Sequence, residues 1–173
     1  NASGITAYYK GNLYLDGYDS ADSTVIHTYR MSVKNGKTKR MMKNASVMEQ
    51  NGQYLIAMPN TGAIVPLSLY VYDCKKGKST CITKKACSAH FVGKKIYYSE
   101  FVKFTGGQDV FRIRSCSLTG KSKKTLVKEI KASNVGKITS KYVYYIRFTD
   151  KANYYRYNFK TKKVKKISQS QFQ

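Results

Sequence analysis

The sequence predicts an all-β fold, β-propeller-like, made of four repeats of about four antiparallel strands each. Two sequence anchors recur about every 43 residues along the 173-residue chain. Tyrosines alternate with other residues as they do in half-buried strands, and short turns with glycine separate the runs. Several short strands in a period of this length are typical of propeller blades, which bury their faces against one another.

A turn and an anchor define the repeat. The turn glycines are Gly36, Gly77 and Gly120, at intervals of 41 and 43 residues, and Thr161-Lys162 takes the fourth place. An aliphatic residue next to tyrosine precedes each turn, at 13–15, 54–56, 96–98 and 143–145. Because both features keep step, we expect a single repeat domain over 1–173, with repeats at roughly 5–43, 44–85, 86–129 and 130–168.

Each repeat is expected to hold four strands in the same order. The first strands are expected at 5–9, 45–49, 87–91 and 133–138, and the second strands carry the aliphatic-tyrosine anchors. The third strands alternate tyrosine, as at Tyr70 and Tyr72. The fourth strands are expected at 38–42, 79–83, 123–127 and 164–168. We expect no helix at 121–131, where β-branched residues occur without a cap.

The motifs at 51–78 carry a resemblance to a known group. An Asn-Gly turn, a Tyr-Leu-Ile strand, a Leu-Tyr-x-Tyr-Asp strand and a Lys-rich glycine turn follow one another there. This order resembles the Tyr- and Lys-rich propeller repeats of exported proteins of Gram-positive bacteria, a group with no assigned reaction that is related to TolB-like repeats. The match is best over 51–84, good over 93–127 and 141–168, and loose over 11–42.

The resemblance implies a propeller fold and a location outside the cell or on its surface. It implies no particular reaction. Such propellers have about six to eight blades, and this chain has room for four. It is therefore expected to be a four-bladed ring, half of a ring that a homodimer completes, or a fragment of a longer protein.

The charge balance indicates the kind of partner. A formal net charge of +23 attracts polyanions, and salt weakens that attraction. In a four-stranded meander, the first and third turns lie at one end of the sheet, so the lysines in these turns predict a basic face. The candidate binding residues are Lys75, Lys76, Lys78, Lys94, Lys95, Lys121, Lys162 and Lys163. Lysines along the outer strands have a structural explanation, because they discourage edge pairing.

The acidic residues gather in the connections between second and third strands, expected at 16–25, 57–67, 99–109 and 147–153. The one close cluster is Asp16, Asp19 and Asp22, whose spacing does not match a calcium loop. We expect no metal site there. These carboxylates are the alternative site, that of a hydrolase or lyase working in the loops opposite the basic turns.

No sequence motif indicates catalysis or a cofactor. A nucleophile elbow, a phosphate loop and a Cys-His pair are all missing from the sequence. We therefore expect no cofactor and predict a non-enzymatic binding or scaffold module for an anionic wall polymer, a glycan or a protein partner. Nucleic acid is less expected, because the basic turns lack interleaved aromatic residues. The sequence also has no apolar run long enough to span a membrane.

The four cysteines leave two interpretations open. Cys74, Cys81, Cys87 and Cys116 do not have the spacing of a zinc site. They are expected to form one or two disulfides of an exported protein, or to be buried free thiols. If all four were oxidised, three pairings would satisfy the sequence equally well.

Overall fold

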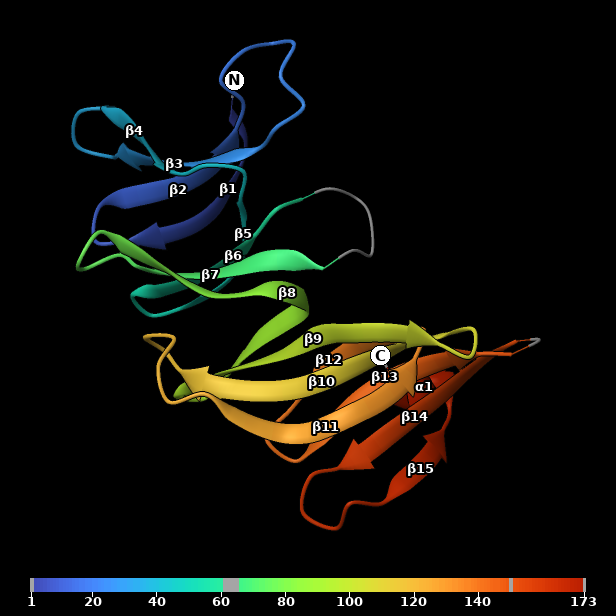
Figure 1. Cartoon of the computed structure of the whole chain (residues 1–173). Coiled ribbons are helices and arrows are strands. Elements are labelled where there is room, and N and C mark those ends of the chain that lie inside the picture. Colours follow the sequence, from blue (N-terminus) through green and yellow to red (C-terminus); the bar gives the residue numbers. More distant parts are fainter. Residues whose placement is uncertain (1, 61–65, 150, 173) are drawn as a thin grey trace. The chain divides into compact units, whose positions relative to one another are not determined.

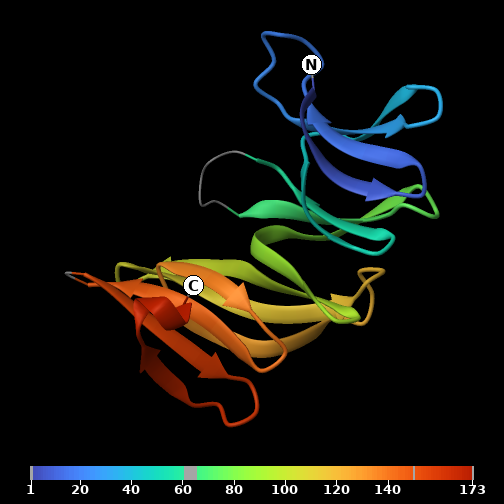
Figure 2. The same ribbon diagram turned by 180° about the vertical axis from the view of Figure 1, so that it is seen from behind.

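The computed structural model describes residues 2–60, 66–149 and 151–172, and these residues are mostly β-structure (Figures 1 and 2). They form fifteen strands and one short helix, α1 (Gln169–Phe172). The all-β prediction is confirmed. The chain divides into two compact units, 1–84 and 85–173. Among the described residues, no helix has the length and apolarity needed to cross a membrane.

The first unit contains one complete four-stranded meander and most of a second. The meander is formed by β1 (Ala2–Tyr9), β2 (Asn12–Gly17), β3 (His27–Ser32) and β4 (Thr38–Met42), each paired antiparallel with the next. The strands β5 (Ser46–Asn51), β6 (Tyr54–Met58) and β7 (Leu67–Asp73) follow, and β8 (Lys78–Val92) begins in this unit. Tyr14 of β2 and Tyr72 of β7 meet edge to face in the core, with ring centroids 6.0 Å apart.

The second unit repeats this plan. It contains the end of β8, then β9 (Lys95–Thr105), β10 (Gln108–Ser117) and β11 (Lys124–Ala132). A second meander consists of β12 (Asn134–Ile138), β13 (Tyr142–Phe148), β14 (Ala152–Asn158) and β15 (Val164–Ile167). Phe111, Ile113 and Val127 from the first group of strands pack with Val143 and Tyr145 from the second in one core cluster.

The alternation in the sequence explains how the strands bury their side chains. In β13, Val143 and Tyr145 are buried in the core, whereas Tyr142, Tyr144 and Ile146 alternate with them and are only half-buried. Burying an apolar side chain of this size contributes about 1.5–3 kcal/mol. A one-residue slip would move every such side chain to the other face, so this pattern fixes the register of the strand.

The prediction of four separate four-strand repeats is wrong in its strand grouping. The sheets contain four, seven and four strands, and no sheet closes on itself in the described part of the chain. The reason is β8, which continues for 15 residues through Lys84 and Lys85 instead of stopping at a turn. One strand thus serves as the fourth strand of the second repeat and the first of the third, because no glycine or proline interrupts it.

Two expected loops also differ from the prediction. The expected connection at 99–109 is mostly strand, because β9 and β10 continue to a tight turn at Gly106 and Gly107, both with positive φ. Glu100, expected in that loop, is instead buried in β9 beside Arg114, with 3.5 Å between Oε2 and Nη1. The expected loop at 147–153 is shorter than predicted, because β13 ends at Phe148 and β14 begins at Ala152. Asp150 lies outside the described residues.

No helix was expected at 121–131, and this segment lies mostly in the strand β11. The short helix α1 was not expected. Its Phe172 lies against Gly136 of β12, where an added Cβ would come within 2.6 Å of the ring, and its ring centroid is 5.2 Å from that of Tyr154. The four cysteines are free thiols, and Cys116 is the buried one.

Candidate functional site

The basic turns are built by hydrogen bonds that recur from repeat to repeat. The backbone N–H of Val33 donates to the carbonyl of Gly11 at 2.9 Å, and Cys74 donates to Gln53 at 2.8 Å. Phe159 donates to Lys141 at 3.0 Å in the same way. Each bond joins the first turn of a meander to its third turn. The two turns therefore share one end of their sheet, as predicted from the sequence.

The predicted basic residues all lie at such turns or directly beside them. In the first unit, Lys75, Lys76 and Lys78 lie at the β7–β8 turn. In the second unit, Lys94 and Lys95 lie at the β8–β9 turn, Lys121 between β10 and β11, and Lys162 and Lys163 between β14 and β15. All eight residues are exposed. That the turns of all repeats form one basic face stays a prediction.

Side-chain caps hold the turns in shape. The Oδ1 atom of Asp73 accepts hydrogen bonds from the backbone N–H groups of Lys75 and Lys76, at 3.0 and 3.2 Å. Asn158 does the same for Lys160 and Thr161, at 2.8 and 3.0 Å. These aspartate and asparagine turns fix the backbone from which the lysines project.

Lys162 stands out from the equivalent turn positions. The N–H of Gly36 donates to the carbonyl of Ser32, four residues earlier, and Gly77 donates to Asp73, both with φ of 65°. Lys162 makes the same bond to Asn158 with φ of 60°. A left-handed backbone costs a residue with a Cβ about 1–2 kcal/mol, and glycine avoids that cost. The fourth repeat therefore carries a strained lysine where the first two have glycine.

Two adjoining hollows surround Lys162 in the second unit. The larger, about 950 Å³, is lined by strands β10 and β11 and by Tyr157 of β14. The smaller, about 600 Å³, lies against the turns before β13 and before β15 and includes Phe159. Thr125, Leu126 and Lys162 line both hollows, so they form one groove.

Most of the charged side chains that line this groove are positive, so we call it the basic groove. Its cationic residues are Arg112, Lys124, Lys128, Lys141, Lys160 and Lys162. Among the described lining residues, Glu129 is the one acid, and its Oε1 lies 3.6 Å from the ammonium of Lys103. The groove thus combines a strong positive field with a partly aromatic wall from Tyr157 and Phe159.

A β-bulge shapes one side of the basic groove. Phe111 of β10 pairs with Ile130 and Ile113 pairs with Val127, so β11 has one residue more than β10 over this stretch. The extra length brings Lys128 and Glu129 opposite Arg112. Bulges commonly redirect side chains next to functional sites.

Of the predicted basic residues, the basic groove includes Lys162. The other five cations of the groove were not among the predicted site residues. Lys124 and Lys128 both lie on the edge strand β11. Lys124 falls in an expected outer strand, where lysine was explained by protection of the sheet edge, and Lys128 comes directly after that strand. These lysines line the groove because β11 lies next to the β14–β15 turn. No local sequence pattern indicates that these two segments are neighbours.

The predicted acidic residues do not form one cluster. Asp16 is buried and accepts a hydrogen bond from the hydroxyl of Ser46. Asp19 is exposed and has other partners, and Asp22 is exposed in the same connection. Within the described part of the chain, no three Asp, Glu, His or Cys side chains come together as potential metal ligands.

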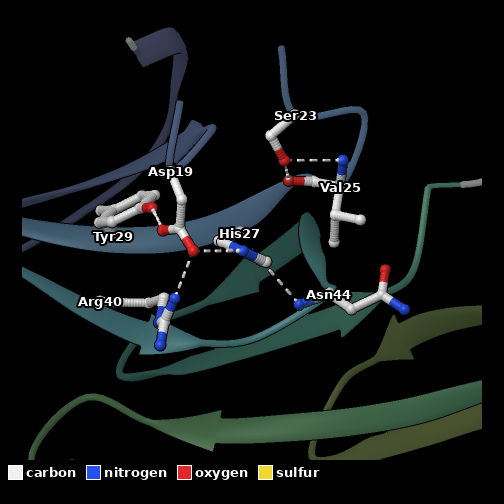
Figure 3. Close-up of polar contacts among 7 residues, drawn as sticks. All are labelled: Asp19, Ser23, Val25, His27, Tyr29, Arg40 and Asn44. Atoms are coloured by element: carbon white, nitrogen blue, oxygen red, sulfur yellow. Dashed lines mark hydrogen bonds and ion pairs between the residues drawn. The ribbon is translucent and has the colours of Figure 1, made fainter. Parts of the chain in front are cut away.

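Asp19 is the centre of a separate polar cluster in the first unit (Figure 3). Its carboxylate accepts hydrogen bonds from the hydroxyl of Tyr29, from Nη1 of Arg40 at 2.6 Å and from Nε2 of His27 at 3.1 Å. The bond from Tyr29, together with the charge of Arg40, lowers the pKa of Asp19 below its usual value of 3.8. The same bond raises the pKa of Tyr29, so it favours the ionised carboxylate of Asp19 and the protonated phenol of Tyr29.

His27 is fully engaged in this cluster. Its side chain is buried, and Nδ1 accepts a hydrogen bond from the backbone N–H of Asn44 at 3.0 Å. The ring proton is therefore on Nε2, which points at Asp19. With both nitrogens used, the imidazole positions Asp19 and has no nitrogen left to act as a general base in this arrangement.

The structure is similar to several solved structures, one of which is a β-propeller domain. The β-propeller domain of the Trilobed protease from Pyrococcus furiosus aligns over 98% of this chain and 58% of its own, with 14% identity and a TM-score of 0.55. TolB from Acinetobacter baumannii aligns over 91% of this chain and 41% of its own, with 14% identity and a TM-score of 0.51. The fold resembles part of a TolB-like β-propeller.

One further neighbour is one of two prolyl endopeptidases, which aligns over 94% of this chain and 28% of its own, with 13% identity and a TM-score of 0.57. This chain therefore spans less than two thirds of the length of the structures it resembles. At these identities the TolB-like similarity concerns the fold alone. No protein-family model and no curated protein matches the sequence.

Proposed function

We propose that this chain is a binding module whose basic groove holds a linear anionic polymer, a wall polymer or an anionic glycan, without chemical turnover. The observation that carries the proposal is Lys162. It keeps a strained backbone where two equivalent turns have glycine, and it lines both hollows of the basic groove. Of the four described residues that have a side chain and a positive φ, Lys162 is the one that lines the groove, which suggests a use for its side chain.

The charge of the groove supports the same ligand class. Six cationic side chains lie along two adjoining hollows, whereas Glu129 is offset by Lys103. A protein with a net charge of +23 also attracts polyanions from a distance. Because five of the six cations are lysines, the groove offers point charges rather than the planar fork of arginine. Such a site suits a polymer with repeated charges more than one rigid phosphate group.

Single-stranded nucleic acid is the competing ligand for this groove. The basic turns lack interleaved aromatic residues, but Tyr157 and Phe159 line the groove beside the lysines. These rings also contact each other, with centroids 6.3 Å apart, and Phe159 stacks on Tyr97. They are thus partly used in packing, so we retain the polysaccharide or wall polymer as the proposed ligand and single-stranded nucleic acid as a competitor in the test.

The remaining parts of the proposal follow from the resemblance of the repeats. We place the protein outside a bacterial cell or on its surface, where wall polymers and glycans occur. A second copy that completes a larger propeller is part of the proposal, because the Pyrococcus domain has additional length beyond the part that this chain matches. A solution mass of twice 19.7 kDa would support the homodimer, and a mass of 19.7 kDa would refute it.

A carboxylate enzyme receives less support from the structure. Asp16 and Asp19 bind different side chains, and His27 is fully engaged. These groups hold the β2–β3 connection and the neighbouring strands together. We therefore interpret them as structural or as part of a binding site.

Binding experiments with charge-reversed variants test the proposed function. Heparin fragments, poly-glutamate and a single-stranded oligonucleotide serve as probes. The double variant Lys128→Glu/Lys162→Glu removes two groove cations, and Lys34→Glu/Lys39→Glu makes the same charge change in exposed residues of the first unit. The proposal predicts a loss of at least about tenfold in heparin affinity for the groove variant only. Equal losses would show attraction by net charge without a site, and preference for the oligonucleotide would contradict the ligand class.

A further inference from the structure

The first unit contains a pocket that differs in character from the basic groove. It has a volume of about 460 Å³ and lies over strands β2, β3 and β4. Leu15 and Met31 give it an apolar lining, and Tyr18 and Tyr29 add two aromatic side chains. Asp19 is the charged residue among the described lining residues. Small-molecule sites have this size and this mixture of apolar surface with a few fixed polar groups.

The polar side of the pocket is held in place before any ligand binds. Asp19 is oriented by Tyr29, Arg40 and His27, and His27 is itself fixed by the backbone N–H of Asn44 (Figure 3). Tyr29 and Arg40 are directly opposite each other on β3 and β4, so the strand pairing sets their spacing. Pre-organised groups lose little freedom on binding, which favours affinity.

Asp19 has capacity for another hydrogen bond. A carboxylate has about four acceptor sites, and three side chains of the described residues use it. About half of the Asp19 side chain is exposed, at 49%, and the adjoining Arg40 side chain is exposed at 45%. A ligand hydroxyl in the pocket can therefore donate to Asp19, whose other side is held by Arg40.

The charges decide what kind of ligand fits. A cation is disfavoured, because Arg40 already neutralises Asp19 and the whole chain carries +23. An anion is disfavoured by the carboxylate in the pocket. What remains is a neutral molecule with hydroxyls on one edge and an apolar face for the tyrosine rings. A sugar ring has this combination.

We propose that the pocket bounded by Leu15, Asp19, Tyr29 and Met31 binds a neutral sugar residue. The inference does not depend on the basic groove, since every residue it uses belongs to the first unit. The alternative carboxylate site thereby receives a role in recognition, with Asp19 as a hydrogen-bond acceptor.

Ligand-observed NMR on the full chain tests this proposal with the methyl glycosides of glucose, galactose, mannose and N-acetylglucosamine, each up to about 20 mM, which covers millimolar affinities. We expect at least one glycoside to bind, with an affinity that does not change between low and physiological salt. Tyr18→Ala and Asp19→Asn should each weaken that binding at least about tenfold. Asp22→Asn, in the same connection, is the matched control and should bind as the wild type does.

The outcomes separate this site from the basic groove. Absence of binding for all four glycosides, or unchanged binding in both pocket variants, would overturn the proposal. If Asp19→Asn disturbs folding, Tyr18→Ala decides the matter, because it removes a pocket ring and leaves the Asp19 cluster intact. The Lys128→Glu/Lys162→Glu variant should bind the glycoside normally, whatever its effect on heparin.

Discussion

Lys162 and Gly77 occupy the same place in equivalent turns, each donating its backbone N–H to a carbonyl four residues earlier, at 2.9 and 2.8 Å. Their φ values are 60° and 65°. The lysine therefore accepts a conformation that favours glycine. We infer that the strained backbone persists at this position because the Lys162 side chain belongs to the basic groove.

Replacing Lys162 with glycine should separate stability from binding. Lys162→Gly relieves the left-handed strain but makes the unfolded chain more flexible, so we expect a gain of about 0.5–1 kcal/mol in the free energy of unfolding. Heparin affinity should fall at the same time. Lys160→Gly is the matched control in the same turn, where φ is not positive, and it should lower stability and affinity together. Urea unfolding and a binding titration measure both effects; a destabilised Lys162→Gly would contradict the account.

The acid stability of the first unit should depend on Asp19. Its pKa is lowered first by the hydrogen bond from Tyr29 and then by Arg40 and His27, from a usual value of 3.8. The folded state therefore favours the carboxylate, so this contribution is present above pH 3.8 and is lost as the pH falls through the lower folded pKa. Thermal unfolding at a series of pH values should show a smaller acid loss for Asp19→Asn than for the wild type. Asp22→Asn should follow the wild type, and identical profiles for all three proteins would count against the cluster.

Buried tyrosines should resist ionisation at high pH. Burial raises the pKa values of Tyr14, Tyr72, Tyr98 and Tyr145 above the usual value of 10. The protonated phenol is favoured in the folded state, so stability is fully present below pH 10 and is lost as the pH rises above it. The tyrosinate absorbance of the 16 tyrosines should rise in two steps, the second coinciding with unfolding. Tyr98→Phe should reduce the second step, and a single step near pH 10 would refute this prediction.

The thiols should react in an order set by burial. Burial raises the pKa values of Cys87 and Cys116 to about 11, whereas Cys81 is exposed. At pH 8 a thiol with such a pKa is a thiolate roughly once in a thousand molecules, and the thiolate is the reactive form. Alkylation of the native protein followed by peptide mass analysis should therefore label Cys81 first, with Cys87 and Cys116 labelled after unfolding. Rapid labelling of Cys116 in the folded protein would contradict its burial.

The strands and turns could be predicted because their causes are local. Alternation such as that of Val143 and Tyr145 gives a strand, and Gly36 or Gly77 gives a turn with positive φ. The continuity of β8 could not be predicted in the same way. Lys84 and Lys85 look like a polar connection, but hydrogen bonding to neighbouring strands on either side of them keeps the backbone extended.

The candidate sites depend on contacts between distant segments. Lys162 was predicted as a binding residue from its turn. Lys124 and Lys128 line the groove because β11 packs beside that turn. Asp19 was predicted as part of an acidic cluster, whereas its partners Tyr29 and Arg40 come from strand register. The register of the hairpin around Gly36 was the one signal in the sequence that could have identified these partners.

The salt dependence of heparin binding shows whether the basic groove holds a polyanion. We would measure the dissociation constant of the wild type and of Lys128→Glu/Lys162→Glu across a series of salt concentrations, with Lys34→Glu/Lys39→Glu as the control. Six groove cations predict a loss of roughly 10²–10³-fold in wild-type affinity between 50 and 200 mM salt, following the behaviour of single-stranded polyanions. The groove variant should show a slope of log affinity against log salt smaller by about one to two, and the control should keep the wild-type slope. Equal slopes for the wild type and the groove variant would contradict the account.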